Sequence, residues 1–164
     1  MESLQYHVDE YKKQLEKGSI QKAYKGLMEY MTALKTHFAN QHPDWSVPGS
    51  LYFGYMDMTY FSLNPAALKG RRLKIAVVFL HEACRFEIWL SGYNKQVQSQ
   101  YWNMIKESGW KKYRLVPDLK GMDSIIEHTA AESPNFDDLE ALTGKIERET
   151  LQFLQDVETF LVEH

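Results

Sequence analysis

Apolar residues in the first 39 positions recur every three or four residues, which is the period of an amphipathic helix. The first series ends before Gly18, a residue type that commonly terminates helices, and consists of Leu4, Val8, Tyr11 and Leu15. A second series consists of Ile20, Ala23, Leu27, Met31, Leu34 and Phe38. We therefore predict two consecutive helices, the second over residues 19–39. Two prolines and a glycine predict a loop over residues 40–50.

The pattern changes in the middle of the chain to dense runs of aromatic and β-branched residues. Residues 51–63 (LYFGYMDMTYFSL) are rich in Tyr, Phe and Met and lack helical spacing, so we predict one long, largely buried strand. Residues 72–80 and 84–91 predict two further strands that form a hairpin.

The hairpin has two different faces if residues 80 and 85 flank a four-residue turn. One face is then purely apolar and must meet the helices, with the pairs Phe79–Phe86, Val77–Ile88 and Ile75–Leu90. The other face mixes charge with an aromatic ring, with the pairs Leu80–Arg85, Val78–Glu87, Ala76–Trp89 and Lys74–Ser91.

The remaining chain predicts a helix over residues 95–108 capped by Asn94, and short strands over 113–116 and 124–129. A long amphipathic helix follows Pro134. The order is ααβββαββα. We predict a single α+β domain over residues 1–164, with a mainly antiparallel sheet and helices packed on one face.

The mixed sheet face is the candidate site. Its predicted residues are Tyr55 and Asp57 from the first strand, Glu87 and Trp89 from the hairpin, and Asn94 and Lys95 at the rim. The face could simply be wet, as one side of an antiparallel sheet often is. It could instead be a cleft floor on which aromatic rings contact a ligand and polar groups orient it. Asp57 could likewise be an exposed or structural carboxylate, or a site residue.

Composition fits one globular domain, since the chain has 164 residues, 44% of them hydrophobic and 13% aromatic. One cysteine excludes an intramolecular disulfide, and the longest apolar run, residues 75–80, is too short to span a membrane. The N-terminus lacks the apolar segment of a signal peptide, so we expect a cytoplasmic protein.

The net charge of -3 gives no general reason to expect nucleic acid or an anionic membrane as a partner. The charge is nevertheless uneven. Residues 1–117 hold 16 Lys and Arg against 10 Asp and Glu, whereas residues 118–164 hold 3 against 12. Basic residues cluster over 69–74 and 106–114, beside aromatic ones, and could bind an anion or face solvent beside the acidic last helix.

Several strings resemble an uncharacterised family of small bacterial proteins. They are KGLMEYMTALK, LYFGYMDMTYFSLNPAALK, LKIAVVFLHEACRFEIWLSGYNK and DSIIEH, and the resemblance covers nearly the whole chain. It implies a bacterial, cytoplasmic, single-domain protein and implies no activity.

The order of elements is also similar to the core of restriction-endonuclease-like nucleases. Those proteins hold a divalent metal with an acidic residue on one strand and an acidic-x-Lys triplet on the next. Here Trp89 stands where that lysine belongs, although Asp57 and Glu87 could still pair, with Lys74 or Lys95 as a displaced lysine. The missing motif argues against catalysis.

We expect a non-enzymatic protein that binds a small molecule or a protein partner on the mixed sheet face. No zinc-type spacing and no glycine-rich phosphate loop occurs, so we expect no metal or cofactor. The alternatives are a divergent metal-dependent nuclease and an interaction module that acts through the two N-terminal helices. The sequence leaves the oligomeric state and the strand order open.

Overall fold

A five-stranded antiparallel sheet forms the centre of the structure, a computed structural model that describes residues 1–164. The strands, in the spatial order β1-β2-β3-β5-β4, are β1 (Met58–Leu63), β2 (Leu73–Leu80), β3 (Arg85–Gly92), β5 (Ile126–Ala131) and β4 (Arg114–Leu115). This confirms the predicted α+β class and the predicted order of elements. One short helix, α3 (Ala66–Lys69), lies in the connection between β1 and β2.

The β2–β3 hairpin has the register that its sequence predicts. Phe79 pairs with Phe86, and Val77 pairs with Ile88. All four of these side chains are buried. A one-residue slip would turn this apolar set to the other face, so hydrophobic burial fixes the pairing.

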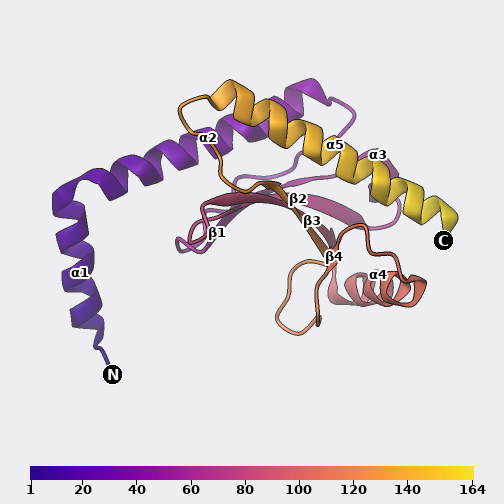
Figure 1. The fold of residues 1–164 in the computed structure, drawn as a ribbon, viewed down its shortest axis with the longest axis horizontal. Coiled ribbons are helices and arrows are strands. Elements are labelled where there is room, and N and C mark those ends of the chain that lie inside the picture. The colour runs from indigo at the N-terminus through magenta and orange to yellow at the C-terminus, as the bar shows by residue number, and fades with distance from the viewer.

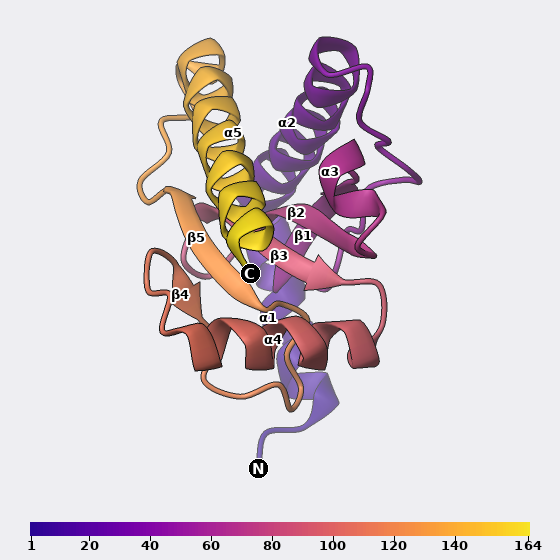
Figure 2. The ribbon, with the colours of Figure 1, turned by 90° about the vertical axis from the view of Figure 1, so that its right-hand side faces the viewer.

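Two long helices, α2 (Ser19–Gln41) and α5 (Leu139–Glu163), lie side by side over the apolar face of the sheet (Figures 1 and 2). Their buried stripes join the apolar sheet residues in a single core, in which Met31, Leu34 and Phe38 come from α2 and Ile146, Phe153 and Val157 from α5. None of the helices combines the length and the apolarity that a membrane span requires.

The first helix, α1 (Leu4–Lys17), projects away from the sheet and the other helices (Figure 1). Gly18 separates it from α2 in a left-handed conformation with φ of 84°, as the sequence predicts for a helix-terminating glycine. No residue of α1 is buried. Its apolar stripe is therefore left largely open to solvent.

The prediction of one strand over residues 51–63 is wrong in its first half. Only Met58–Leu63 form β1, while residues 53–57 form a turn that brings Tyr52 back to pair with Tyr60. Gly54 has a φ of 74°, and a Cβ atom there would lie 2.0 Å from the carbonyl oxygen of Met58. A glycine is needed at this position because the backbone doubles back on itself.

The fourth helix, α4 (Lys95–Ser108), lies on the opposite side of the sheet from α2 and α5 (Figures 1 and 2). Asn94 caps it as predicted, since its Oδ1 accepts a hydrogen bond of 2.9 Å from the backbone N–H of Val97. Val97, Tyr101 and Ile105 on its inner face are buried. The helix thereby covers one end of the mixed sheet face and leaves the rest open.

Candidate functional site

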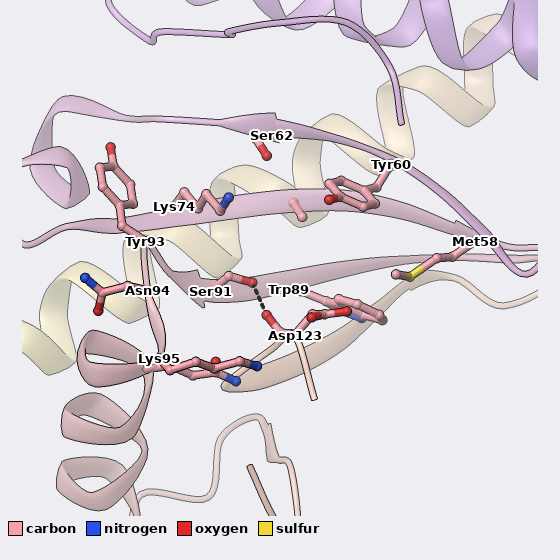
Figure 3. A pocket seen from close by; sticks show the side chains of 13 residues that line it. Met58, Tyr60, Ser62, Lys74, Trp89, Ser91, Tyr93, Asn94, Lys95 and Asp123 are labelled. Atoms are coloured by element: carbon pink, nitrogen blue, oxygen red, sulfur yellow. Dashed lines mark hydrogen bonds between the residues drawn. The ribbon is translucent and has the colours of Figure 1, made fainter. Parts of the chain in front are cut away.

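A hollow of about 210 Å³ lies on the mixed sheet face where β1, β2 and β3 meet the first turn of α4 (Figure 3). The strand register explains its position. Ser62 of β1 stands opposite Ala76 of β2, and Ala76 stands opposite Trp89 of β3. The two small side chains leave space beside the large indole ring, and that space is the floor of the hollow.

Aromatic and apolar side chains form one end of the hollow, where Met58, Tyr60 and Trp89 are each only partly buried (Figure 3). Burial, and after it the nearby charge of Asp123 and the Tyr52 hydroxyl, raises the pKa of Tyr60. The Tyr60 hydroxyl therefore stays protonated at neutral pH and can donate a hydrogen bond. Open aromatic surface of this kind can contact a flat ligand group.

Trp89 is held by charged neighbours on the same strand. Its Nε1 donates a 2.8 Å hydrogen bond to Oε1 of Glu87, whose Oε2 accepts a 2.6 Å bond from Nε of Arg85. Glu87 is buried, with an exposed fraction of 5%. Its hydrogen bond raises the pKa of Arg85, so the guanidinium stays charged. Glu87 thus fixes the orientation of the indole.

The other end of the hollow is polar and contains two lysines, whereas the carboxylate of Asp123 extends toward Trp89 (Figure 3). Lys74 is half-buried, and its ammonium has no ion-pair or hydrogen-bond partner. Nζ of Lys95 donates a 2.9 Å bond to the carbonyl oxygen of Met122 and forms no ion pair. The carboxylate of Asp123 is also without an ion-pair partner, although its backbone carbonyl accepts a 2.8 Å bond from Ser91 (Figure 3). Summed over the whole hollow, the two lysines and the aspartate give a formal charge of +1.

The N-terminus of α4 contributes to the same end, because Tyr93, Asn94, Lys95 and Gln98 line the hollow. The first-turn backbone N–H groups of a helix lack intrahelical acceptors, and the helix dipole is positive there. Gln98 is buried and has a structural role. Its Nε2 donates hydrogen bonds to the carbonyl oxygens of Met122 and Ser124 at 3.0 and 3.1 Å. These bonds fix the loop that carries Asp123 against the helix.

The structure brings together three of the six predicted site residues, since Trp89, Asn94 and Lys95 line this hollow. Glu87 faces a separate, charged hollow beside β4 and β5. Tyr55 and Asp57 lie in the turn before β1 and line neither of these hollows. The expected grouping of Asp57 with Glu87 rested on a continuous strand over 51–63, which the turn at Gly54 interrupts.

Asp57 has a structural part in that turn. Its Oδ1 accepts a 2.8 Å hydrogen bond from the backbone N–H of Tyr55. Backbone amides, first that of Tyr55 and then those of Met58 and Asp57 itself, hold the pKa of this exposed carboxyl below its ordinary value. No group of three or more His, Cys, Asp or Glu side chains is placed to hold a metal ion. The nuclease alternative therefore gains no support from Asp57 and Glu87.

The sequence analysis places Ser91 on the mixed face without naming it as a site residue. Further lining residues were not predicted from the sequence, namely Tyr60, Ser62, Tyr93, Gln98 and Asp123. Strand alternation could have predicted Ser62, because it follows Tyr60 by two residues and therefore lies on the same face of β1. Asp123 comes from a loop that no pairing rule places, so its presence depends on the tertiary fold.

The uneven charge of the sequence is partly neutralised within the fold. Nζ of Lys112 lies 3.1 Å from Oδ1 of Asp156, and Arg114 pairs with Glu127. The basic segment after α4 thus meets acidic residues of β5 and α5. Lys74 and Lys95 remain as unpaired cations beside the hollow.

Comparison with known proteins identifies a family. A family model described as a domain of unknown function (DUF7000) matches residues 4–161, and the chain therefore belongs to that family. No curated protein and no solved structure matches the chain.

Proposed function

We propose that this member of the DUF7000 family binds a small organic acid that carries a flat, apolar group, and that the hollow between the sheet and α4 is the binding site. The cellular setting that we propose is the one implied by the sequence resemblance, the bacterial cytoplasm. The observation that carries the proposal is the unpartnered ammonium of the half-buried Lys74, in the same hollow as the open aromatic surface of Trp89 and Tyr60.

Charge supports an acid as the ligand. A partly buried cation gains from a nearby anion, and Lys74 forms no ion pair with Asp123 or with any other acidic side chain. The exposed Lys95 also forms no ion pair. The N-terminus of α4 adds a further positive contribution. A carboxylate or phosphate at this end would supply the missing countercharge and accept charge-assisted hydrogen bonds.

Shape supports a flat group on the other side of the ligand. The floor of Ser62 and Ala76 lies beside the indole of Trp89, which Glu87 holds in one orientation. A pre-oriented ring reduces the entropy lost on binding. A volume of about 210 Å³ suits a single ring with one acidic group rather than a dinucleotide.

Isothermal titration calorimetry with benzoate tests this proposal, with benzamide as the uncharged analogue. We expect benzoate to bind and benzamide to bind at least about tenfold more weakly, because the amide cannot neutralise Lys74. Lys74→Gln should weaken benzoate binding by about tenfold or more. Lys111→Gln, which removes the same charge from an exposed lysine outside the hollow, should leave it unchanged.

Three outcomes would contradict the proposal. One is equal binding of benzoate and benzamide, which would show that the charge plays no part. Another is an equal loss of binding in Lys74→Gln and Lys111→Gln, which would indicate attraction by net charge alone. Benzoate that fails to bind at all would also overturn it, since the acid and the ring are its two stated elements.

A further inference from the structure

No other part of the chain packs over the apolar stripe of α1 closely enough to bury it. Leu4, Tyr11 and Val8 are 79%, 59% and 45% exposed, and no residue of the helix is buried. Most of the stability of a short helix comes from packing its apolar face rather than from helix propensity. An isolated, 14-residue amphipathic helix that projects from the body is therefore a candidate interaction surface.

The stripe continues into a third hollow, at the base of α1. It measures about 470 Å³, and its apolar lining residues come from α1, the start of α2 and the turn before β1, namely Tyr11, Leu15, Ile20, Tyr24, Tyr55 and Met56. Tyr55, at the edge of this hollow, is 91% exposed. The open apolar surface thus extends from the tip of α1 to the body of the protein.

The spacing of the stripe fits a paired helix. Leu4, Val8, Tyr11 and Leu15 are separated by four, three and four residues, which is the heptad pattern of coiled-coil core positions. Charge along α1 and its approach is also polarised. Three acidic residues precede Tyr11 (Glu2, Asp9 and Glu10), whereas three lysines and one glutamate follow it (Lys12, Lys13, Lys17 and Glu16), a net of two positive charges.

We propose that α1 pairs with α1 of a second copy of this chain in the antiparallel direction. Antiparallel pairing sets the acidic half of each helix against the basic half of its partner and opposes the two helix dipoles. Parallel pairing would set like charges together. The proposal does not rest on the ligand-binding function above.

The same direction gives a consistent set of core contacts. When Leu4 lies opposite the partner's Leu15, Val8 lies opposite the partner's Tyr11, so all four stripe positions are filled in a two-fold symmetric arrangement. The first turn of each helix then approaches the hollow at the base of its partner. This contact would cover Tyr55 and Met56, whose exposure the single chain leaves unexplained.

Sedimentation velocity of the full chain over about 1 to 100 µM tests the pairing. We expect a monomer–dimer equilibrium with a dissociation constant in the micromolar range, because α1 is only about 21 Å long and the interface is small. Val8→Glu should abolish the dimer at all these concentrations. Lys111→Gln, which makes the same change in net charge at an exposed lysine outside α1, should leave the equilibrium within about twofold.

Each remaining result overturns the proposal. A wild-type chain that stays monomeric throughout has no such interface, and a dimer that survives in Val8→Glu uses another surface. Far-UV circular dichroism of Val8→Glu establishes that the fold is retained, which the exposure of Val8 predicts.

Disulfide trapping tests the direction, in a background in which the exposed Cys84 is replaced by serine. The double variant Leu4→Cys with Leu15→Cys should form covalent dimers under mild oxidation. Leu4→Cys alone should form none, because the antiparallel arrangement separates the two copies of position 4. Efficient cross-linking of the single variant would indicate parallel pairing and contradict the assignment.

Discussion

At the scale of the residue, a few side chains fix the surroundings of the hollow. Glu87 is the clearest case, since both of its carboxylate oxygens accept hydrogen bonds and orient Trp89 and Arg85. Each oxygen of this buried carboxylate thus has a donor, as a buried charged group requires. Sequence alternation places Glu87 on the correct face, but it cannot distinguish a ligand-binding group from one that positions its neighbour.

The turn at residues 53–57 depends on Gly54, and we predict that Gly54→Ala destabilises the protein by about 2 kcal/mol or more. The physical reason is a steric clash with the carbonyl oxygen of Met58, added to the strain of a positive φ. Gly18→Ala is the matched control, because it has a similar φ of 84° but no neighbour within 4 Å. It should cost only about 1 kcal/mol. Urea unfolding measures both changes, and equal losses would contradict the role assigned to the close approach.

Glu147 makes a pH-dependent link between α5 and the end of α2. Its Oε1 and Oε2 lie 3.1 and 2.8 Å from Nε2 of His37 and of His42. Burial alone would raise the pKa of Glu147, but the hydrogen bonds from the two histidines outweigh it and hold the pKa below its ordinary value of 4.5. The charged form is therefore favoured in the folded state.

We predict that Glu147→Gln removes a stabilising contribution of about 1 kcal/mol at pH 6 to 7. Because the folded pKa is lower than the unfolded one, this contribution is fully present above the unfolded value and is lost as the pH falls through the folded value. The difference in unfolding free energy between wild type and variant should therefore shrink below about pH 4.5. A difference that is constant from pH 7 to pH 3 would show that the link does not depend on ionisation.

At the scale of the element, the contribution of a helix to stability depends on the surface that it buries. Leu4 of α1 is 79% exposed and Leu34 of α2 is 1% exposed. At concentrations at which the chain is monomeric, we predict that Leu4→Ala changes the unfolding free energy by less than about 0.5 kcal/mol, whereas Leu34→Ala costs about 2–5 kcal/mol. Chemical denaturation at low protein concentration measures both. A large effect of Leu4→Ala would indicate that α1 packs against its own chain.

The elements differ in how well the sequence predicts them. The β2–β3 hairpin is predicted to the register because its apolar pairs leave only one arrangement that buries them all. The helix cap at Asn94 and the helix end at Gly18 are predicted because each has a local physical cause. The strand over 51–63 fails because one glycine reverses the chain inside a run whose composition favours a strand throughout.

At the scale of the whole molecule, the two faces of the sheet differ in how completely helices cover them. One side is sealed by α2 and α5 and contains the core, whereas α4 covers only part of the other (Figure 2). The sequence predicts the mixed character of this second face and three residues of its hollow. It does not predict the loop that carries Asp123, because that loop is positioned by hydrogen bonds to Ser91 and Gln98 from distant parts of the chain.

The central claim is that an aromatic acid binds against Trp89, and the indole N–H resonances in a two-dimensional 1H–15N NMR spectrum test it most directly. The chain has four tryptophans, and Trp89→Phe identifies the signal of interest. During a titration with benzoate we expect the Trp89 signal to shift progressively and to saturate, while those of Trp45, Trp102 and Trp110, which do not line the hollow, stay in place. A stationary Trp89 signal, or a shift confined to the other three, would contradict the account.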